Sequence, residues 1–165
     1  MSENDQELFN LAMSDESRPL MYAVKKHIAD NVEPITEEFF ALDNAKEDRW
    51  SWHPRQLELL QGAKDKAKES GLWNFFLPDS EIGEGLTNLD YAYIATELGK
   101  FALASETLNC SAPDTGNMEV LERVGTEAQK EQWLKPLLNG DIRSAYAMTE
   151  PGIPSSDAKN IATSA

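Results

Sequence analysis

Cysteine, histidine and long apolar runs are scarce in this sequence of 165 residues. Its one cysteine, Cys110, cannot form an intrachain disulfide, so nothing indicates an oxidising compartment and a cytoplasmic location is the default expectation. The apolar runs are interrupted by charge and never approach the roughly 20 residues needed to cross a bilayer. The sequence therefore predicts a soluble protein without a membrane span, with one domain or one domain and the beginning of another.

Basic residues are also in short supply. Fifteen lysines and arginines stand against 29 acidic residues, which gives a formal net charge of -14. This charge repels phosphate backbones and anionic lipid headgroups, so neither nucleic acids nor membrane surfaces are expected as partners. Acidic residues are dense near the start, whereas transit peptides are rich in arginine, so no targeting segment is expected. Residues 1–16 are predicted to form a flexible acidic arm.

The few histidine and cysteine side chains also limit the chemistry of the chain. His27, His53 and Cys110 do not stand at metal-ligand spacing, so no metal site is predicted. Cys110 has no nucleophile signature around it and is interpreted as a small buried residue. His27 lies at the border of an apolar helix face, where a hydrogen-bonded structural histidine is expected. His53 precedes Pro54 and is interpreted as part of a helix entry.

Helical periodicity dominates the sequence up to about residue 140. Ser17 is predicted to cap a long first helix that is kinked at Pro34. A second helix is predicted from His53 to Ser70, with Leu57 on its core face. Start and stop signals place the remaining helices within residues 87–99, 113–125 and 126–140, after an irregular loop at residues 77–85.

Several large apolar residues between and at the ends of these helices are assigned to the core. Trp50 and Trp52 stand at a connection between two helices, where aromatic rings usually close the core. Trp73, Phe75 and Phe76 are likewise expected to pack into the core. The same is expected of Val124, the last apolar residue of the predicted helix within residues 113–125.

The pattern changes at Asp141. Residues 142–148 alternate in a way that a strand can use, and residues 159–165 are predicted to begin a second strand after an interruption by proline and glycine. Two strands without further partners are marginal in water, so the chain is expected to be a fragment. The expected fold class is mainly α, with a helical domain over residues 17–140.

One segment, Tyr146–Asp157, is the most informative about function. An extended backbone, then Thr149, a Pro/Gly turn and the hydroxyls of Ser155 and Ser156 suit a polar heterocycle followed by a phosphate. Backbone groups can pair with the heterocycle while hydroxyls meet the anion. From these residues alone, a strand followed by a structural hydroxyl-rich turn is the simpler interpretation.

A family resemblance favours the first interpretation. The run Tyr-Ala-Met-Thr-Glu-Pro at residues 146–151, followed by Ser-Ser-Asp at 155–157, resembles the flavin-binding signature of the acyl-CoA dehydrogenase family. Residues 109–118 resemble the branch whose animal members carry a phosphotransferase-like domain ahead of the dehydrogenase. Shorter pieces occur in the family's order: Leu-Pro-Asp at 77–79, Glu-Leu-Gly at 97–99, Gly-Thr at 125–126 and Trp-Leu at 133–134.

The resemblance implies a fold, a reaction and several partners. It implies a helical bundle domain over residues 17–140 and, over residues 141–165, the first strands of a truncated β-barrel middle domain. FAD is the implied cofactor, acyl-CoA the substrate and an electron-transfer flavoprotein the electron acceptor, in a parent protein that is a homo-oligomer when full length. The implied reaction is α,β-desaturation in fatty acid metabolism, as in beta-oxidation. The catalytic carboxylate is implied to lie in a missing C-terminal domain, so the fragment is expected to be inactive alone.

The resemblance also assigns roles to individual residues. Tyr146, Met148 and Thr149 match positions that approach the flavin ring. Ser156 matches the serine beside the FAD pyrophosphate and the acyl-CoA, and Ser155, also assigned to the cofactor site, replaces the family's usual glycine. Glu150 is interpreted as a structural turn residue and not as the catalytic base. Two alternatives remain: a flavin oxidase or monooxygenase on the same scaffold, and a helical interaction module that binds no cofactor.

Overall fold

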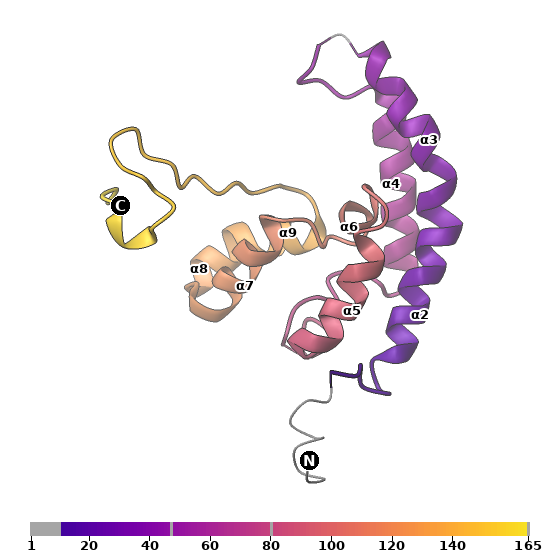
Figure 1. The fold of residues 1–165 in the computed structure, drawn as a ribbon, viewed down its shortest axis with the longest axis horizontal. Coiled ribbons are helices and arrows are strands. Elements are labelled where there is room, and N and C mark those ends of the chain that lie inside the picture. The colour runs from indigo at the N-terminus through magenta and orange to yellow at the C-terminus, as the bar shows by residue number, and fades with distance from the viewer. Residues whose placement is uncertain (1–10, 47, 80, 165) are drawn as a thin grey trace. The chain divides into compact units, whose positions relative to one another are not determined.

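The computed structural model describes residues 11–46, 48–79 and 81–164 (Figure 1). The chain divides into two compact units, Met1–Thr115 and Gly116–Ala165. Helices account for the regular structure of the described residues in both units, which agrees with the mainly α fold predicted for residues 17–140. No helix within the described ranges combines the length and the apolar content that a membrane span requires.

The first described helices of the first unit form one continuous run. It consists of α2 (Arg18–His27), the π-helical turn η1 (Ile28–Val32) and α3 (Glu33–Ala41) (Figure 1), and the 3-10 turn η2 (Leu42–Ala45) follows. Pro34 has no N–H to donate, and the wider turn η1 directly before it accommodates the missing hydrogen bond. The disturbance expected at Pro34 therefore takes the form of a π-helical turn within a continuous helix.

The second predicted helix is present as α4 (Pro54–Glu69). At its start, Nδ1 of His53 accepts a hydrogen bond from the backbone N–H of Arg55 at 3.1 Å. In return, Oε1 of Gln56 accepts from the backbone N–H of His53, also at 3.1 Å. Gly71, with φ of 69°, follows the helix end. The predicted role of His53 as a helix entry is confirmed.

The core face of α4 differs from the predicted one. Leu57 is 51% exposed, while Gln56 is completely buried. The Nε2 group of Gln56 donates to the carbonyl of Phe39 at 2.8 Å and to Oδ1 of Asp43 at 2.9 Å. A buried amide is tolerated because these acceptors replace water. The assignment of Leu57 to the core was therefore wrong.

Two further helices of the first unit are α5 (Asn88–Leu98) and α6 (Ala104–Thr107). Thr87 caps α5 by accepting a hydrogen bond from the backbone N–H of Asp90, whose carboxylate in turn accepts from the backbone N–H of Ser14 at 2.8 Å. This contact holds the start of the described chain against α5. Residues 1–10 of the predicted acidic arm lie outside the described residues, and its extent stays a prediction.

The buried residues of the first unit come from its described α-helices and from the segments between them, above all the loop between α4 and α5. Phe75 and Phe76 are buried, which confirms packing as their role, whereas Trp50 and Trp52 are 79% and 53% exposed. The assignment of these two tryptophans to the core was wrong, although the Trp52 ring still contacts that of buried Phe39 at 5.8 Å between centroids. Asp48 fixes the loop of these tryptophans by accepting backbone hydrogen bonds from Trp50 and Ser51.

His27 joins α2 to α6 inside the first unit. Its ring is 3% exposed, with Nε2 3.2 Å from Oγ1 of Thr107 and Nδ1 3.4 Å from Nδ2 of Asn31. The Thr107 hydroxyl donates to the carbonyl of Ala104 at 2.9 Å, so its oxygen is left to accept from the imidazole. A neutral ring with its proton on Nε2 satisfies all of these groups. The prediction of a hydrogen-bonded structural histidine is confirmed.

Acidification is expected to destabilise the first unit through His27. Burial lowers the pKa of His27, and the carboxylate of Asp30 only partly opposes this. The unfolded chain therefore takes up this proton at a higher pH than the folded chain does. The free energy of unfolding falls as the pH drops below about 6.5, the pKa of His27 in the unfolded chain. Between about pH 7.5 and 5, the free energy of unfolding from urea titration should fall more steeply in the unsubstituted chain than in His27→Gln. Equal slopes would contradict this role.

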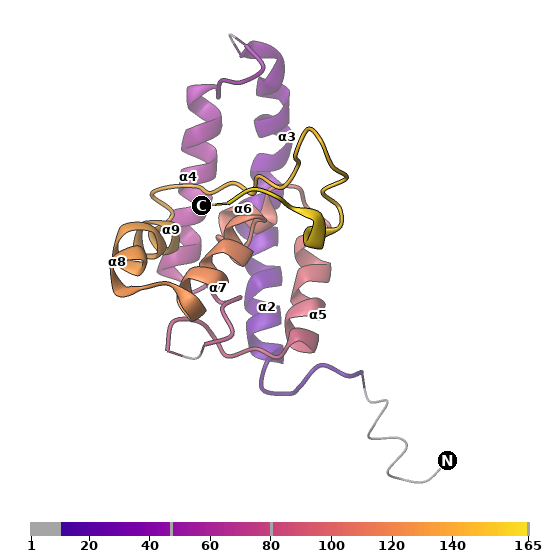
Figure 2. The same cartoon turned by 90° about the vertical axis from the view of Figure 1, so that its left-hand side faces the viewer.

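The second unit contains most of α7 (Asp114–Val124), then α8 (Glu127–Gln129), the π-helical turn η3 (Lys130–Leu134) and α9 (Lys135–Asn139) (Figure 2). Thr126 and Gln129 form the predicted capping box before α8, and Gly140 ends α9 in the left-handed conformation with φ of 78°. Val124, however, is 76% exposed at the last position of α7, so its assignment to the core was wrong.

The predicted first strands of a β-barrel are not confirmed. Residues 141–164 contain an isolated antiparallel bridge between Glu150 and Ile153 and the 3-10 turn η4 (Ala158–Asn160), but no strand. A strand needs a neighbour that pairs with its backbone, and no described segment of this chain takes that place beside residues 142–148. Ala165, the end of the second predicted strand, lies outside the described residues.

Candidate functional site

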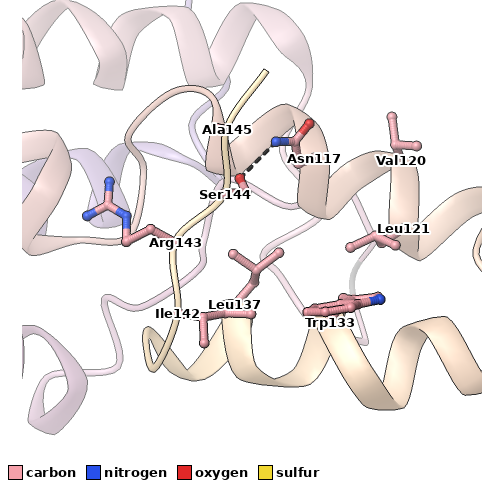
Figure 3. A pocket seen from close by; sticks show the side chains of 9 residues that line it. All are labelled: Asn117, Val120, Leu121, Trp133, Leu137, Ile142, Arg143, Ser144 and Ala145. Atoms are coloured by element: carbon pink, nitrogen blue, oxygen red, sulfur yellow. Dashed lines mark hydrogen bonds between the residues drawn. The ribbon is translucent and has the colours of Figure 1, made fainter. Parts of the chain in front are cut away.

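The candidate site lies in the second unit, where an extended segment leaves α9 and leads to the turn at residues 150–157. The start of this segment forms one wall of a cavity of about 400 Å³ (Figure 3). Helices α7 and α9 and the turn η3 form the other walls. The lining residues are Asn117, Val120, Leu121, Trp133, Leu137, Ile142, Arg143, Ser144 and Ala145.

A polar link and an apolar contact region hold the extended segment against the helices. Nδ2 of Asn117, on α7, donates to Oγ of Ser144 at 2.8 Å (Figure 3). Ile142 lies near Leu137 of α9, which is itself buried. The sequence does not single out Asn117 and Ser144 as a pair, because residues 27 positions apart carry no local signal of contact.

The residues assigned to the flavin ring lie further along the extended segment. Tyr146 is 69% exposed, Met148 is half-buried and Thr149 is exposed. Burial alternates from residue to residue along most of the segment, as in a β-strand, even though no strand is formed. Ile142, Ser144, Met148 and Glu150 are half-buried, and Arg143, Ala145, Ala147 and Thr149 are exposed.

The two serines assigned to the cofactor differ in their surroundings. Ser155 is 7% exposed, and its Oγ accepts a hydrogen bond from the backbone N–H of Glu150 at 2.7 Å. The same hydroxyl donates to the carbonyl of Ile153 at 3.4 Å, so it closes the turn internally. Ser156 is exposed, and its side chain is accessible from solvent.

Glu150 makes structural contacts through its carboxylate. It accepts hydrogen bonds from the backbone N–H of Ala162 at 3.1 Å and of Thr163 at 2.7 Å, and also from the hydroxyl of Thr163. These hydrogen bonds, that of the Thr163 hydroxyl first, lower the pKa of Glu150. A carboxylate held ionised in this way is a weak base and supports the turn.

Other candidate reactive groups are outside the candidate site. Cys110 is buried, and its thiol contacts the carbonyl of Leu108 at 3.4 Å. Burial raises the pKa of the Cys110 thiol far above its usual range, so the thiolate needed for nucleophilic attack is not available. The predicted burial of this cysteine is confirmed. Across residues 11–46, 48–79 and 81–164, no cluster of three or more His, Cys, Asp or Glu could hold a metal ion.

Comparison with known sequences identifies similar proteins. The model of the family "Acyl-CoA dehydrogenase, N-terminal domain" matches residues 14–141. Acyl-CoA dehydrogenase family member 10 of Mus musculus is 48% identical over 153 residues, which cover 86% of this chain and 14% of the mouse protein. Acyl-CoA dehydrogenase family member 11 of Homo sapiens is 48% identical over 138 residues, which cover 84% of this chain and 17% of the human protein.

A solved structure is similar in fold and in sequence. It belongs to a Mycobacterium abscessus protein assigned as an acyl-CoA dehydrogenase, with a TM-score of 0.81 and 44% identity. The match covers 92% of this chain and 38% of the mycobacterial chain. This chain therefore spans less than half the length of the solved structure and less than a fifth of the length of the two animal relatives.

Proposed function

The chain belongs to the acyl-CoA dehydrogenase family, and from this premise we propose that its parent protein is an FAD-dependent acyl-CoA dehydrogenase. The proposed reaction is α,β-desaturation of an acyl-CoA thioester, with electrons passing to an electron-transfer flavoprotein. The chain contributes the N-terminal helical domain and the start of the flavin site. The observation that carries the proposal is the family match over residues 14–141, which leads directly into the signature segment at residues 146–157.

The groups present in the signature segment fit FAD. When bound, FAD supplies the two-electron acceptor that desaturation requires. The extended backbone of residues 145–148 has no paired strand among the described residues, so its N–H and C=O groups are available to a planar heterocycle. The exposed hydroxyls of Thr149 and Ser156 can meet polar and anionic groups. Because the Ser155 hydroxyl closes the turn, this residue is left with its backbone N–H as a donor.

The proposed reaction needs a catalytic base that the signature segment at residues 146–157 does not supply. The reaction requires a carboxylate base close to the substrate, and the carboxylate of Glu150 already accepts hydrogen bonds from backbone N–H groups and from a hydroxyl within the chain. We place the base in a part of the parent protein beyond the helical domain. On this proposal the isolated chain has no turnover, and the parent is a cytoplasmic homo-oligomer that binds acyl-CoA partly through Ser156.

Substrate-driven flavin reduction tests the reaction. When an acyl-CoA is added without oxygen, we expect the visible flavin absorbance of the purified parent protein to bleach, while the isolated chain produces no enoyl-CoA. On admission of air, the reduced dehydrogenase should reoxidise slowly and release little peroxide. Fast reoxidation with peroxide release would instead identify an oxidase, and unchanged absorbance with a range of acyl chain lengths would contradict both.

A further inference from the structure

We propose that the hydrogen bond between Asn117 and Ser144 orients the signature segment at residues 146–157, with Asn117 acting as a positioning residue for FAD. The inference rests on the proposed function, because it concerns the same segment. Asn117 lies within the stretch of residues 109–118 whose motif resembles one branch of the family, yet nothing in the proposed reaction uses this asparagine. In the structure, the side chain of Asn117 donates a hydrogen bond to Ser144, just before the signature segment.

The hydrogen bond lies where the extended segment leaves the cavity. Asn117 belongs to α7, and Ser144 belongs to the extended segment, two residues before Tyr146. Their side chains meet at 2.8 Å at the edge of the cavity (Figure 3). The cavity lining ends at Ala145, so Ser144 is the last cavity residue with a polar side chain. The helices hold the segment at this point, and the signature residues follow outside the cavity.

Because the segment is extended, the orientation of Ser144 determines which way the later side chains point. Successive side chains point to opposite faces, so the orientation of one residue fixes the faces of those that follow. Burial alternates from Ile142 to Glu150 in this way, with Tyr146 as an exposed exception beyond the cavity. Holding Ser144 toward α7 therefore places Met148 on the same face and Thr149 on the opposite one. A slip by one residue would exchange these faces.

The length of the segment amplifies any movement at the Asn117 contact. Thr149 lies five residues beyond Ser144, which is about 16 Å in an extended chain. A small rotation at this contact therefore moves the Thr149 hydroxyl by much more than it moves Ser144. The apolar packing of Ile142 does not fix this rotation, because such packing is not directional. A directional hydrogen bond fixes the rotation about the segment, as the alignment of a flavin ring requires.

Substitutions at the two partners in the parent protein test the positioning role. Asn117→Ala and Ser144→Ala each remove the bond, and we expect FAD affinity to weaken about five- to ten-fold. We also expect the visible circular dichroism of the remaining bound flavin to change. Ser144→Thr keeps the hydroxyl, and Asn117→Asp can accept from it, so both should stay within about two-fold of the unsubstituted protein. Gln61→Ala, which removes an exposed amide bonded to Asp65 on α4, should leave FAD binding unchanged.

The outcomes separate this inference from the proposed function. If the unsubstituted parent takes up no FAD, the proposed function is wrong and the inference falls with it. If the parent binds FAD and both alanine variants bind it with unchanged affinity and dichroism, only the positioning role is wrong. A lower melting temperature with unchanged flavin properties also overturns the positioning role, because it shows a structural role alone. Should Asn117→Ala not fold, Ser144→Ala decides the question, since it removes only a hydroxyl.

Discussion

Replacing Phe75 with alanine is expected to lower the free energy of unfolding by about 3–5 kcal/mol. The ring is 1% exposed and lies 6.3 Å from the ring of Tyr91, between centroids. Truncation removes buried apolar area and leaves a cavity, because Leu77 and Phe76 beside it in the chain are buried and cannot easily fill the space. Urea unfolding followed by circular dichroism measures the change.

A second aromatic residue of the same unit provides the control. Trp50 is larger than Phe75 but 79% exposed, and its ring contacts the guanidinium of Arg49 at 4.5 Å from the centroid. Trp50→Ala should therefore cost no more than about 1 kcal/mol. Comparable losses in the two variants would show that the loop with Trp50 is packed in solution, contrary to the structure.

Replacing Gly83 with alanine is expected to destabilise the first unit by about 3 kcal/mol. An added Cβ would lie 2.2 Å from the carbonyl oxygen of Leu77 and 2.7 Å from its Cβ. Leu77 is completely buried, and the backbone N–H of Gly83 donates to the carbonyl of Asp79 at 2.7 Å, so neither side can move without losing contacts. Thermal and urea unfolding should both report the loss.

Gly62 is the matched control for Gly83. It lies within α4, and a Cβ added there meets no atom within 4 Å. Gly62→Ala should raise the free energy of unfolding by about 0.5–1 kcal/mol, since alanine restricts the unfolded chain and favours the helix. The two substitutions add the same methyl group and should have opposite signs. A destabilising Gly62→Ala, or a neutral Gly83→Ala, would contradict the packing of these segments.

Most helix boundaries could be predicted from the sequence because their causes are local. The capping box of Thr126 and the left-handed Gly140 depend on neighbours within a few residues. The identity of core residues depends on distant partners. Gln56 is buried in place of Leu57 because acceptors on Phe39 and Asp43 are near it in space, and periodicity does not reveal them.

From the sequence, the candidate site could be predicted only as a segment of the chain, without its contacts to other segments. The composition of residues 146–157 and the resemblance indicate a flavin signature, and the roles of Tyr146, Met148, Thr149, Ser155 and Ser156 stay predictions. A strand at residues 142–148 depends on a partner that no local pattern supplies, and the described chain does not provide one. Likewise, the contact between Asn117 and Ser144 joins segments 27 residues apart, so only the structure could show it.

Flavin uptake by the parent protein is the most direct measurement of the central claim. The protein should be purified, stripped of small molecules under mild conditions, titrated with FAD and analysed for bound flavin and for retained helical structure. We predict saturable uptake of about one FAD per chain, with a visible spectrum perturbed from that of free FAD. A folded parent that remains colourless at saturating FAD would contradict the assignment of residues 146–157 to a flavin site.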